Sequence, residues 1–307
     1  MKVVSYLSSI PQSKPANPDK LAILHKFIQG VNAAGDTGLT YQGNEVQFAD
    51  VGLIQGWQHE AGKNAAHLKL RSDVSTQQLA RNKYCCVADA NLFLFSSLTG
   101  NSPHYYLRYS FNGVFPDTGV YFDDSPVAAR WDQIQKDLDI TIGDNKIGGR
   151  HILLCTQRNG GWSMGPYSIH DWLISTIAEI RKYTDRPIVI RAHPGDKRSE
   201  LYIKHFRADS SLIISNNTMD GDLHNCHAVV NHNSSSIVGS LIAGYPAFIT
   251  DSLRSQCAEV ASADLSQIET PQTYDRIKWL HRISMCHWKF SELENGDAWR
   301  HMRNYVQ

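Results

Sequence analysis

Three short stretches in the second half of the sequence carry side chains suited to holding a phosphate group. The first stretch, residues 157–163, contains Arg158, whose charge could offset that of an oxyanion. Its paired glycines, Gly160 and Gly161, would let backbone N–H groups come close to an oxygen atom, and Ser163 adds a hydroxyl. An ordinary turn would use the same residue types, so this stretch supports a phosphate site only in combination with the other two.

The second stretch, residues 191–196, places His193 directly before a proline. The proline ends a strand-like run, so the imidazole is expected to point beyond that strand, where it can donate a hydrogen bond to a phosphate oxygen. Arg191 could add a charge-assisted hydrogen bond to the same group. The alternative is a histidine packed against a turn, which is the more common fate of a solitary histidine.

The third stretch begins at Asn231 and leads into a predicted helix through three consecutive serines, Ser234, Ser235 and Ser236. The N–H groups at a helix N-terminus attract anions, and serine hydroxyls add donors without bulk. Helix capping also favours serine and asparagine. One capping residue would be enough for that purpose, so three serines favour an anion site.

Alternating buried strands and helices in the second half would bring these stretches together. The strands are predicted at 151–155, 187–191, 212–215, 228–231 and 246–249, and the helices at 168–182, 199–206 and 235–243. Helical crossovers of this length give a parallel sheet, and such sheets bind ligands at the carboxyl ends of their strands. All three stretches follow a predicted strand, so they are expected at the same edge.

The first half is less regular but follows the same α/β pattern. Its strands are predicted at 3–7, 51–54, 84–89 and 105–109, and its helices at 19–31, 75–81 and 126–138. Gly148 and Gly149 form the best candidate linker, which divides the chain into α/β domains at residues 1–147 and 148–270. Residues 271–307 are predicted to form a helical tail that packs back on the first domain.

The composition is typical of a globular protein, with 307 residues, 42% hydrophobic and 20% charged. Lys plus Arg equals Asp plus Glu at 30 each, which counts against a protein that mainly coats nucleic acid. The six cysteines form no C-x-x-C pair, which predicts a reducing cytoplasm without disulfides or a zinc site. Neither a secretory signal nor a membrane span is expected, and the oligomeric state stays open.

Taken together, the motifs of the second half resemble a known family. The order Ile-Val-Ile-Arg-x-His-Pro, Val-Asn-His-Asn-Ser-Ser-Ser and Leu-Ile-Ala-Gly-Tyr-Pro-Ala is similar to the C-terminal half of GT-B-fold glycosyltransferases, in particular bacterial capsule-type sugar transferases and sialyltransferases. The resemblance covers residues 150–260. It implies two Rossmann-like domains facing a cleft, with His193 and the three serines on the phosphate of a nucleotide-sugar donor.

The implied reaction moves a sugar from a nucleotide sugar to a hydroxyl acceptor, with no metal or other cofactor. The leaving diphosphate gains negative charge as the glycosidic bond breaks, and fixed donors aimed at it would stabilise the transition state. No Asp-x-Asp tripeptide directly follows one of the predicted strands, the position that the motif has in metal-dependent transferases. Two alternatives stay open, a nucleotide-sugar epimerase of the same fold and a non-catalytic nucleotide-binding module.

A transferase also needs a base to take the acceptor proton, and the sequence does not single one out. The sialyltransferase pattern has an acidic pair followed by Gly in the first domain, whereas the nearest match here, Asp123-Asp124-Ser125, lacks the Gly. The base and a cytidine-monophosphate donor are therefore left open. The candidate bases near predicted strand ends are Asp73, Asp89 and Asp123.

The acceptor side is predicted from residues of the first domain. These are Gly56, Trp57, Lys69 and Arg71. The two cations could line a groove for an anionic polymer and Trp57 could stack on a sugar, although a cationic helix face and a core tryptophan are the plainer interpretations. The acceptor is either a glycan or a hydroxymethylated pyrimidine of bacteriophage DNA, which would have to leave the base stack.

Overall fold

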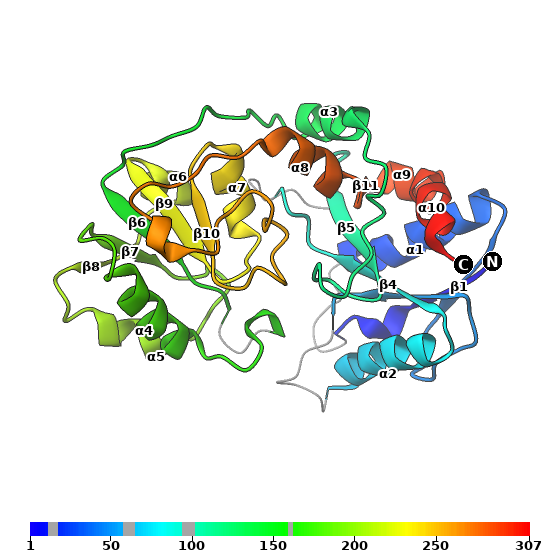
Figure 1. Ribbon diagram of the computed structural model, residues 1–307. Helices are drawn as coiled ribbons and strands as arrows, with labels where there is room; N and C mark the ends of the chain where they lie inside the picture. Colours follow the sequence, from blue (N-terminus) through cyan, green and yellow to red (C-terminus); the bar gives the residue numbers. More distant parts are fainter. Residues whose placement is uncertain (12–17, 58–64, 94–101, 159–161) are drawn as a thin grey trace. The chain divides into compact units, whose positions relative to one another are not determined.

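Two β-sheets, each flanked by helices, organise the chain into two units. The computed structural model describes residues 1–11, 18–57, 65–93, 102–158 and 162–307. Unit 1 comprises Met1–Asp139 and Leu280–Gln307, and unit 2 comprises Ile140–Trp279 (Figure 1).

Unit 2 begins before the predicted linker at Gly148, because the segment ahead of that glycine pairs with unit 2. Gly143 N–H donates a hydrogen bond to Ile242 O at 2.8 Å. At the other end, Arg276 Nη1 donates to Leu241 O at 2.7 Å, which keeps this part of the predicted tail with unit 2.

Unit 1 contains a six-stranded sheet with the order β11-β5-β4-β3-β1-β2. Its strands are β1 (Lys2–Tyr6), β2 (Thr37–Tyr41), β3 (Val51–Gln55), β4 (Tyr84–Asp89), β5 (Tyr106–Phe111) and β11 (His287–Lys289). Strands β1 to β4 pair in parallel, and β5 runs antiparallel to both of its neighbours. The sequence predicts four of these strands, and β2 and β11 are additional.

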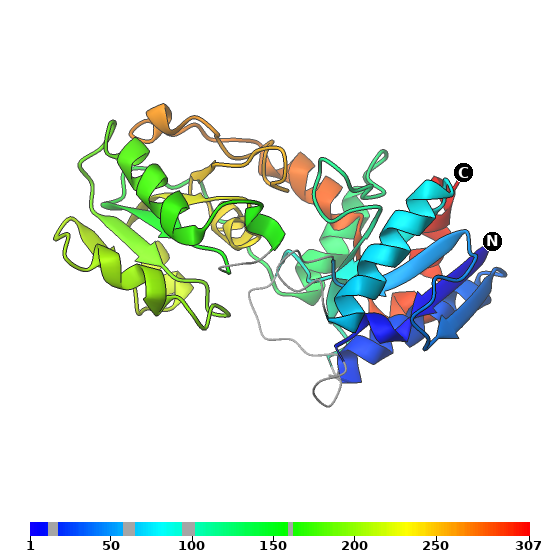
Figure 2. The ribbon, with the colours of Figure 1, turned by 90° about the horizontal axis from the view of Figure 1, so that it is seen from below.

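Helices cover both faces of this sheet. They are α1 (Pro18–Ala33), α2 (Ala66–Ala80), α3 (Ala128–Asp137), α9 (Phe290–Glu294) and α10 (Asp297–Met302). Helices α1 and α2 lie on opposite faces (Figure 2). On the α1 face, buried Phe27 contacts buried Trp299 of α10, with ring centroids 5.9 Å apart. The last helices therefore contribute to the apolar core of unit 1.

Unit 2 contains a five-stranded parallel sheet with the order β10-β9-β6-β7-β8. Its strands are β6 (His151–Cys155), β7 (Ile188–Arg191), β8 (Leu212–Ile214), β9 (Cys226–Asn231) and β10 (Ala247–Ile249). Its helices are α4 (Ile169–Ile180), α5 (Glu200–Ile203), α6 (Met219–Leu223) and α7 (Ser236–Ile242), and α8 (Arg276–Ser284) contains the junction with unit 1. Helices α4 and α5 cover one face, and α6 and α7 cover the other, as right-handed crossovers require (Figure 1).

Helix α4 shows how the local sequence sets these elements. It begins after Ser168, whose hydroxyl oxygen accepts a hydrogen bond from Asp171 N–H at 3.1 Å. Ile169, Trp172 and Leu173 are buried at the spacing of one helix face. That face packs into the apolar core of unit 2.

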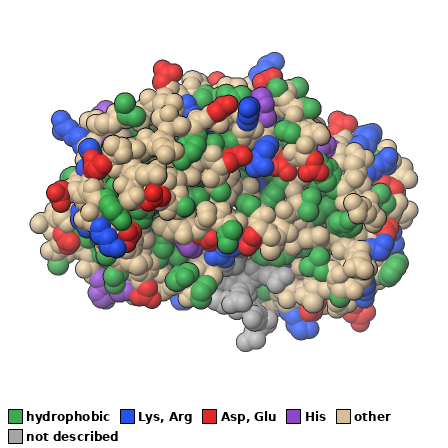
Figure 3. Space-filling view, in the orientation of Figure 1, with side chains coloured by type: hydrophobic (Ala, Val, Ile, Leu, Met, Phe, Trp, Pro, Cys, Tyr) green, Lys and Arg blue, Asp and Glu red, His purple; other side chains and the backbone are tan. Residues whose placement is uncertain are grey.

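The predicted α/β fold class, with two Rossmann-like sheets, is confirmed by this topology. None of the helices in the described part of the chain combines the length and apolar character needed to cross a membrane. Acidic and basic side chains are interspersed over the face of the protein in Figure 3.

Candidate functional site

Loops from three neighbouring strands meet at the carboxyl edge of the sheet in unit 2, and hydrogen bonds join them. Thr156, directly after β6, accepts a hydrogen bond through Oγ1 from His193 N–H, after β7, at 3.0 Å. The next residue, Gln157, accepts through Oε1 from Asn233 N–H, after β9, at 2.9 Å. Because β6 lies between β7 and β9, its loop holds both neighbouring loops in place. The structure thus brings together the three stretches that the sequence analysis singles out.

Asn233 is the centre of a second set of contacts at this edge. Its Nδ2 donates to Ser163 O at 3.0 Å and to Asp251 Oδ2 at 2.9 Å. Gln157 Nε2 donates to Ser163 Oγ at 2.7 Å, and Arg254 Nε donates to the same Asp251 oxygen at 2.7 Å. The end of the first loop is therefore tied to the loops after β9 and β10, and the Ser163 hydroxyl keeps its own hydrogen for donation.

His193 is held in one tautomer by its own loop. Gly195 N–H donates to His193 Nδ1 at 2.9 Å, so the proton of the neutral ring lies on Nε2. Burial lowers the pKa of His193, and the nearby Arg158 charge lowers that pKa further. No described residue accepts a hydrogen bond from Nε2. The imidazole is thus a neutral donor with its N–H left for a ligand.

Arg158 brings a positive charge to the same place. A Cβ added to Gly195 would lie 2.8 Å from Arg158 Nη2 and 3.1 Å from His193 Cε1, so the glycine backbone fits between these two side chains. The Arg158 side chain is exposed. Gly160 and Gly161 lie outside the described residues, so their expected part in this loop stays a prediction.

The serines after β9 leave hydroxyls at the surface. Ser234 Oγ accepts a hydrogen bond from Ser236 N–H at 3.3 Å, and Ser234 O accepts one from Asn231 Nδ2 at 2.9 Å. Ser235 occupies the N-cap position of α7, yet its side chain makes no capping hydrogen bond and is exposed. Capping therefore does not account for Ser235, and its hydroxyl is available to a ligand.

Arg191 has a different set of contacts from the one expected. Its Nη1 donates to Asp222 Oδ2 and to Asn217 O, both at 2.7 Å. The Asp222 side chain is 1% exposed and also accepts hydrogen bonds from the Ser215 hydroxyl. The guanidinium therefore neutralises a buried carboxylate and ties β7 to the loop after β8. A phosphate contact for Arg191 stays a prediction.

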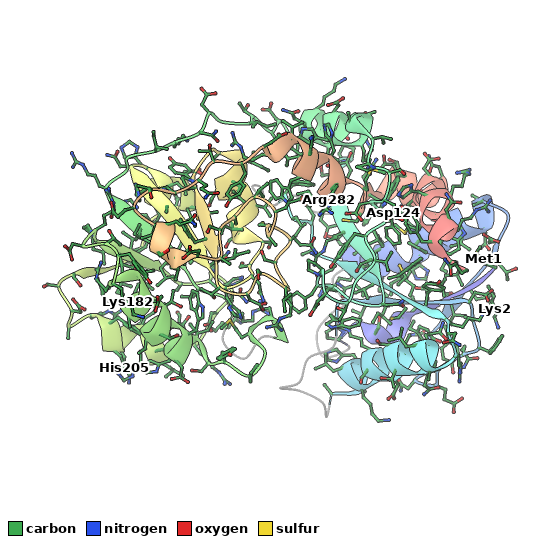
Figure 4. All side chains as sticks on the ribbon, viewed as in Figure 1. Met1, Lys2, Asp124, Lys182, His205 and Arg282 are labelled. Atoms are coloured by element: carbon green, nitrogen blue, oxygen red, sulfur yellow. The ribbon has the colours of Figure 1, made fainter. Side chains whose placement is uncertain are left out.

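The three candidate bases lie in different places in unit 1. Asp89 ends β4 at the carboxyl edge, where its Oδ2 accepts a hydrogen bond from buried Arg108 at 2.6 Å, and the Asp89 side chain is 20% exposed. Asp73 lies on α2 and pairs with exposed Lys69 at 3.4 Å. Asp123 follows the far end of β5 and pairs with Arg282 at 3.6 Å; Figure 4 labels this arginine and Asp124.

Three of the four predicted acceptor-side residues, Gly56, Trp57 and Arg71, lie together at the end of β3. Arg71 is buried, and it donates through Nε to Ser9 O at 2.9 Å and through Nη1 to Trp57 O at 3.1 Å. Gly56 has φ +78°, and a Cβ there would lie 3.0 Å from Arg71 Nη1, so both its conformation and its contact favour glycine. Lys69 points elsewhere, since its side chain is 73% exposed.

Sequence reasoning missed the contribution of the loop after β10. Besides Asp251, it supplies Thr250 Oγ1, which bonds to His232 Nδ1 and accepts from Trp172 Nε1, both at 2.8 Å. A cavity of about 290 Å³ beside the edge is lined by Thr250, His232 and Trp172, together with Tyr167. The available signal was that Thr250 and Asp251 follow a buried strand, as the other edge residues do.

The comparisons with known proteins agree with this architecture at the level of fold. No protein-family model matches the sequence, and no curated protein matches it. The chain is similar to the β-Kdo 2,7-transferase of KpsC from Thermosulfurimonas dismutans, with a TM-score of 0.52, 14% identity, and coverage of 97% of this chain and 99% of that one. The β-Kdo 2,4-transferase of the same KpsC gives a TM-score of 0.52 at 11% identity, with coverage of 93% and 90%.

A UDP-GlcNAc 2-epimerase from Methanocaldococcus jannaschii also matches, covering 99% of both chains at 10% identity. Its TM-score of 0.37 is too low to support an argument. The two transferase structures show the fold alone at these identities, and they confirm the GT-B-like fold class expected from the motifs.

Proposed function

We propose that this chain is a glycosyltransferase that moves a sugar from a nucleotide-sugar donor to a hydroxyl acceptor. The observation that carries the proposal is the neutral His193 at the carboxyl edge of unit 2, with its Nε2–H unbonded to any described residue and the Arg158 charge beside it. Parallel α/β sheets bind their ligands at this edge. A diphosphate is the ligand that suits a fixed N–H donor, an adjacent guanidinium and free serine hydroxyls.

The proposed chemistry follows from where charge develops. As the bond from the anomeric carbon to the donor phosphate breaks, the phosphate oxygen gains negative charge. His193 Nε2–H and the Arg158 guanidinium would stabilise that charge, and Ser235 would donate a further hydrogen bond. Because Gly195 and Thr156 hold the imidazole loop in place before the donor arrives, little reorganisation is needed during the reaction. The proposal includes no metal ion.

Asp89 is the proposed base for the acceptor hydroxyl. Among the three candidates, it alone ends a parallel strand at a carboxyl edge while keeping part of its carboxylate exposed. The ion pair with Arg108 fixes the position of that carboxylate. We further propose a glycan acceptor over a pyrimidine in DNA, since Lys plus Arg equals Asp plus Glu at 30 each and the chain therefore has no net positive charge to attract a duplex.

The test is incubation of the protein with uridine, cytidine and guanosine nucleotide sugars, with and without acceptors. Nucleotide release and sugar identity are both followed by chromatography. A glycosyltransferase releases nucleotide in step with acceptor glycosylation. A change of sugar identity without net release would instead establish an epimerase, and binding without any turnover would leave a nucleotide-binding module.

A further inference from the structure

A group of basic side chains at the carboxyl edge of unit 1 has no place in the donor chemistry. We call it the basic cluster, and it consists of Lys20, His67 and Arg71. Lys20 lies in the first turn of α1, and His67 and Arg71 lie one turn apart on the same face of α2. Because α1 follows β1 and α2 follows β3, the first turns of both helices belong to this edge.

Arg71 carries a buried charge with which no described carboxylate forms an ion pair. The residue is 8% exposed, and its hydrogen bonds go to two carbonyl oxygens, Ser9 O and Trp57 O. No described residue accepts a hydrogen bond from its remaining amino group, Nη2. Burying a guanidinium is costly unless an anion compensates it, as Asp222 compensates Arg191 in unit 2.

The other two members of the basic cluster increase the positive potential around Arg71. Burial lowers the pKa of Lys20, and the Arg71 charge lowers that pKa further. The pKa of His67 is lowered by burial, then by Arg71 and then by Lys20. The three groups therefore lie within electrostatic range of one another. In the described ranges, no carboxylate pairs with any of the three.

The start of α2 adds to this potential. Its N-cap residue is Ala65, which offers no side-chain hydrogen bond, and its first turn contains no acidic residue. In unit 2, by contrast, α4 is capped by Ser168 with Asp171 in its first turn, and α6 is capped by Thr218. Among the described residues, no cap and no acidic side chain of the first turn compensates the positive end of the α2 dipole, which lies where the cations collect.

We propose that the basic cluster binds an oxyanion of the acceptor, a carboxylate or a phosphate, so that the acceptor is an acidic sugar. This inference rests on the proposed transferase function. The uncapped N–H groups of α2 and Arg71 Nη2 supply the hydrogen bonds, and Lys20 and His67 supply further charge. Asp89 lies close enough to influence Arg71, because its carboxylate partly offsets the effect of burial, which lowers the pKa of Arg71 to about 10. The proposed anion site and the proposed base therefore lie at the same carboxyl edge of the sheet in unit 1.

The experiment measures binding without donor or turnover. Methyl glucoside, methyl glucuronoside and glucose 6-phosphate are titrated into the full chain by calorimetry. We expect both anionic sugars to bind at least about tenfold more tightly than the neutral one, as charge-assisted hydrogen bonds predict. Arg71→Gln should abolish this preference, whereas Lys69→Gln on the exposed side of the same helix should leave it unchanged.

Further variants show whether the preference for anionic sugars arises at this site or at the donor site, and whether its loss reflects a folding defect. His193→Ala should keep the preference for anionic sugars, which assigns it to unit 1 even if no transfer activity is ever found. Lys20→Gln, at a partly exposed position, should weaken the preference about threefold if Arg71→Gln fails to fold. Equal binding of the three sugars to the wild type, or an unchanged preference in both Lys20→Gln and a folded Arg71→Gln, would overturn the proposal.

Discussion

At the carboxyl edge of unit 2, Arg191 pairs with Asp222 and Arg254 pairs with Asp251, whereas Arg158 lies exposed near His193. The loops there are cross-linked through the side chains of Gln157 and other neutral residues. In unit 1, the carboxyl edge of the parallel strands carries the pair of Asp89 with Arg108, and among the described residues no carboxylate forms an ion pair with the basic cluster. The two edges therefore differ in local charge balance, although parallel strands form both of them.

Under the two proposals made above, this difference corresponds to two ways of recognising a negative group. The edge of unit 2 offers donors whose positions are set in advance by neighbouring loops, which suits a reacting phosphate whose charge changes during the reaction. The edge of unit 1 offers cations with which no described carboxylate forms an ion pair, which suits a group that is anionic throughout and orients its molecule. Variants in each unit test whether unit 2 binds the donor phosphate and whether unit 1 supplies the base.

The largest effect is expected from Asp89→Asn. If unit 1 supplies the base, kcat should fall by about 10²–10⁴-fold while nucleotide affinity stays the same. The stability of the variant must be measured beside its activity, because buried Arg108 loses its counter-charge. Asp73→Asn and Asp123→Asn are the controls and should keep wild-type rates. An unchanged rate per folded molecule in Asp89→Asn would show that Asp89 is not the base.

His193→Ala tests the proposed donor-phosphate site of unit 2. Loss of one preorganised donor to the leaving phosphate should lower kcat by about 10²–10³-fold, and the melting temperature should change little because the side chain is only partly buried. His205→Ala, at an exposed position of unit 2 labelled in Figure 4, is the matched control. Equal activity in the two variants would show that the imidazole does not act on the phosphate.

The pH dependence of nucleotide binding separates a neutral donor from a charged one. The pKa of His193 lies below its ordinary value near 6.5, first through burial and then through Arg158, so the ring is already neutral at pH 7. Raising the pH from 7 to 9 removes no proton from it. The Kd for UDP, measured by calorimetry, should therefore change by less than about twofold over this range. A tenfold loss of affinity would mean that a protonated imidazole holds the phosphate.

Ser235→Ala should have the smallest effect and sharpens the interpretation of the serine stretch. Because Ser235 makes no capping hydrogen bond, the free energy of unfolding should change by less than about 0.5 kcal/mol. If the hydroxyl contacts the donor phosphate, the Kd for UDP should still rise by about threefold to tenfold. A lower free energy of unfolding with an unchanged Kd for UDP would show that Ser235 caps the helix and does not contact the phosphate.

The strands of unit 2 could be predicted from the sequence because they are short apolar runs ended by proline, glycine or polar residues. Helix α2 was harder, since its buried face includes Arg71, Ser75 and Gln78, and no apolar period marks its beginning. Strand β2 lies at a sheet edge with mostly exposed side chains, so it lacks the alternation of a half-buried strand. The three residues of β11 become a strand only by pairing with β5.

The candidate site shows the same limit. Strand ends place His193 and the serine stretch at one edge, and this much follows from sequence order and the rules of parallel sheets. The partner of Arg191 does not follow, because Asp222 is 31 residues away in the sequence. That no described carboxylate forms an ion pair with Arg71 is equally invisible, since Asp73, two residues away in the sequence, pairs with Lys69 instead.

Unit 1 is assembled from both ends of the chain, with all of unit 2 between them. During synthesis on the ribosome, Trp299 and Met302, which complete the core beside Phe27, emerge only after unit 2 has been made. Unit 2 is continuous in sequence and can fold while translation proceeds, whereas the first 139 residues must wait with part of their apolar surface uncovered. Chaperones that bind nascent chains should therefore act mainly on the N-terminal segment of this protein.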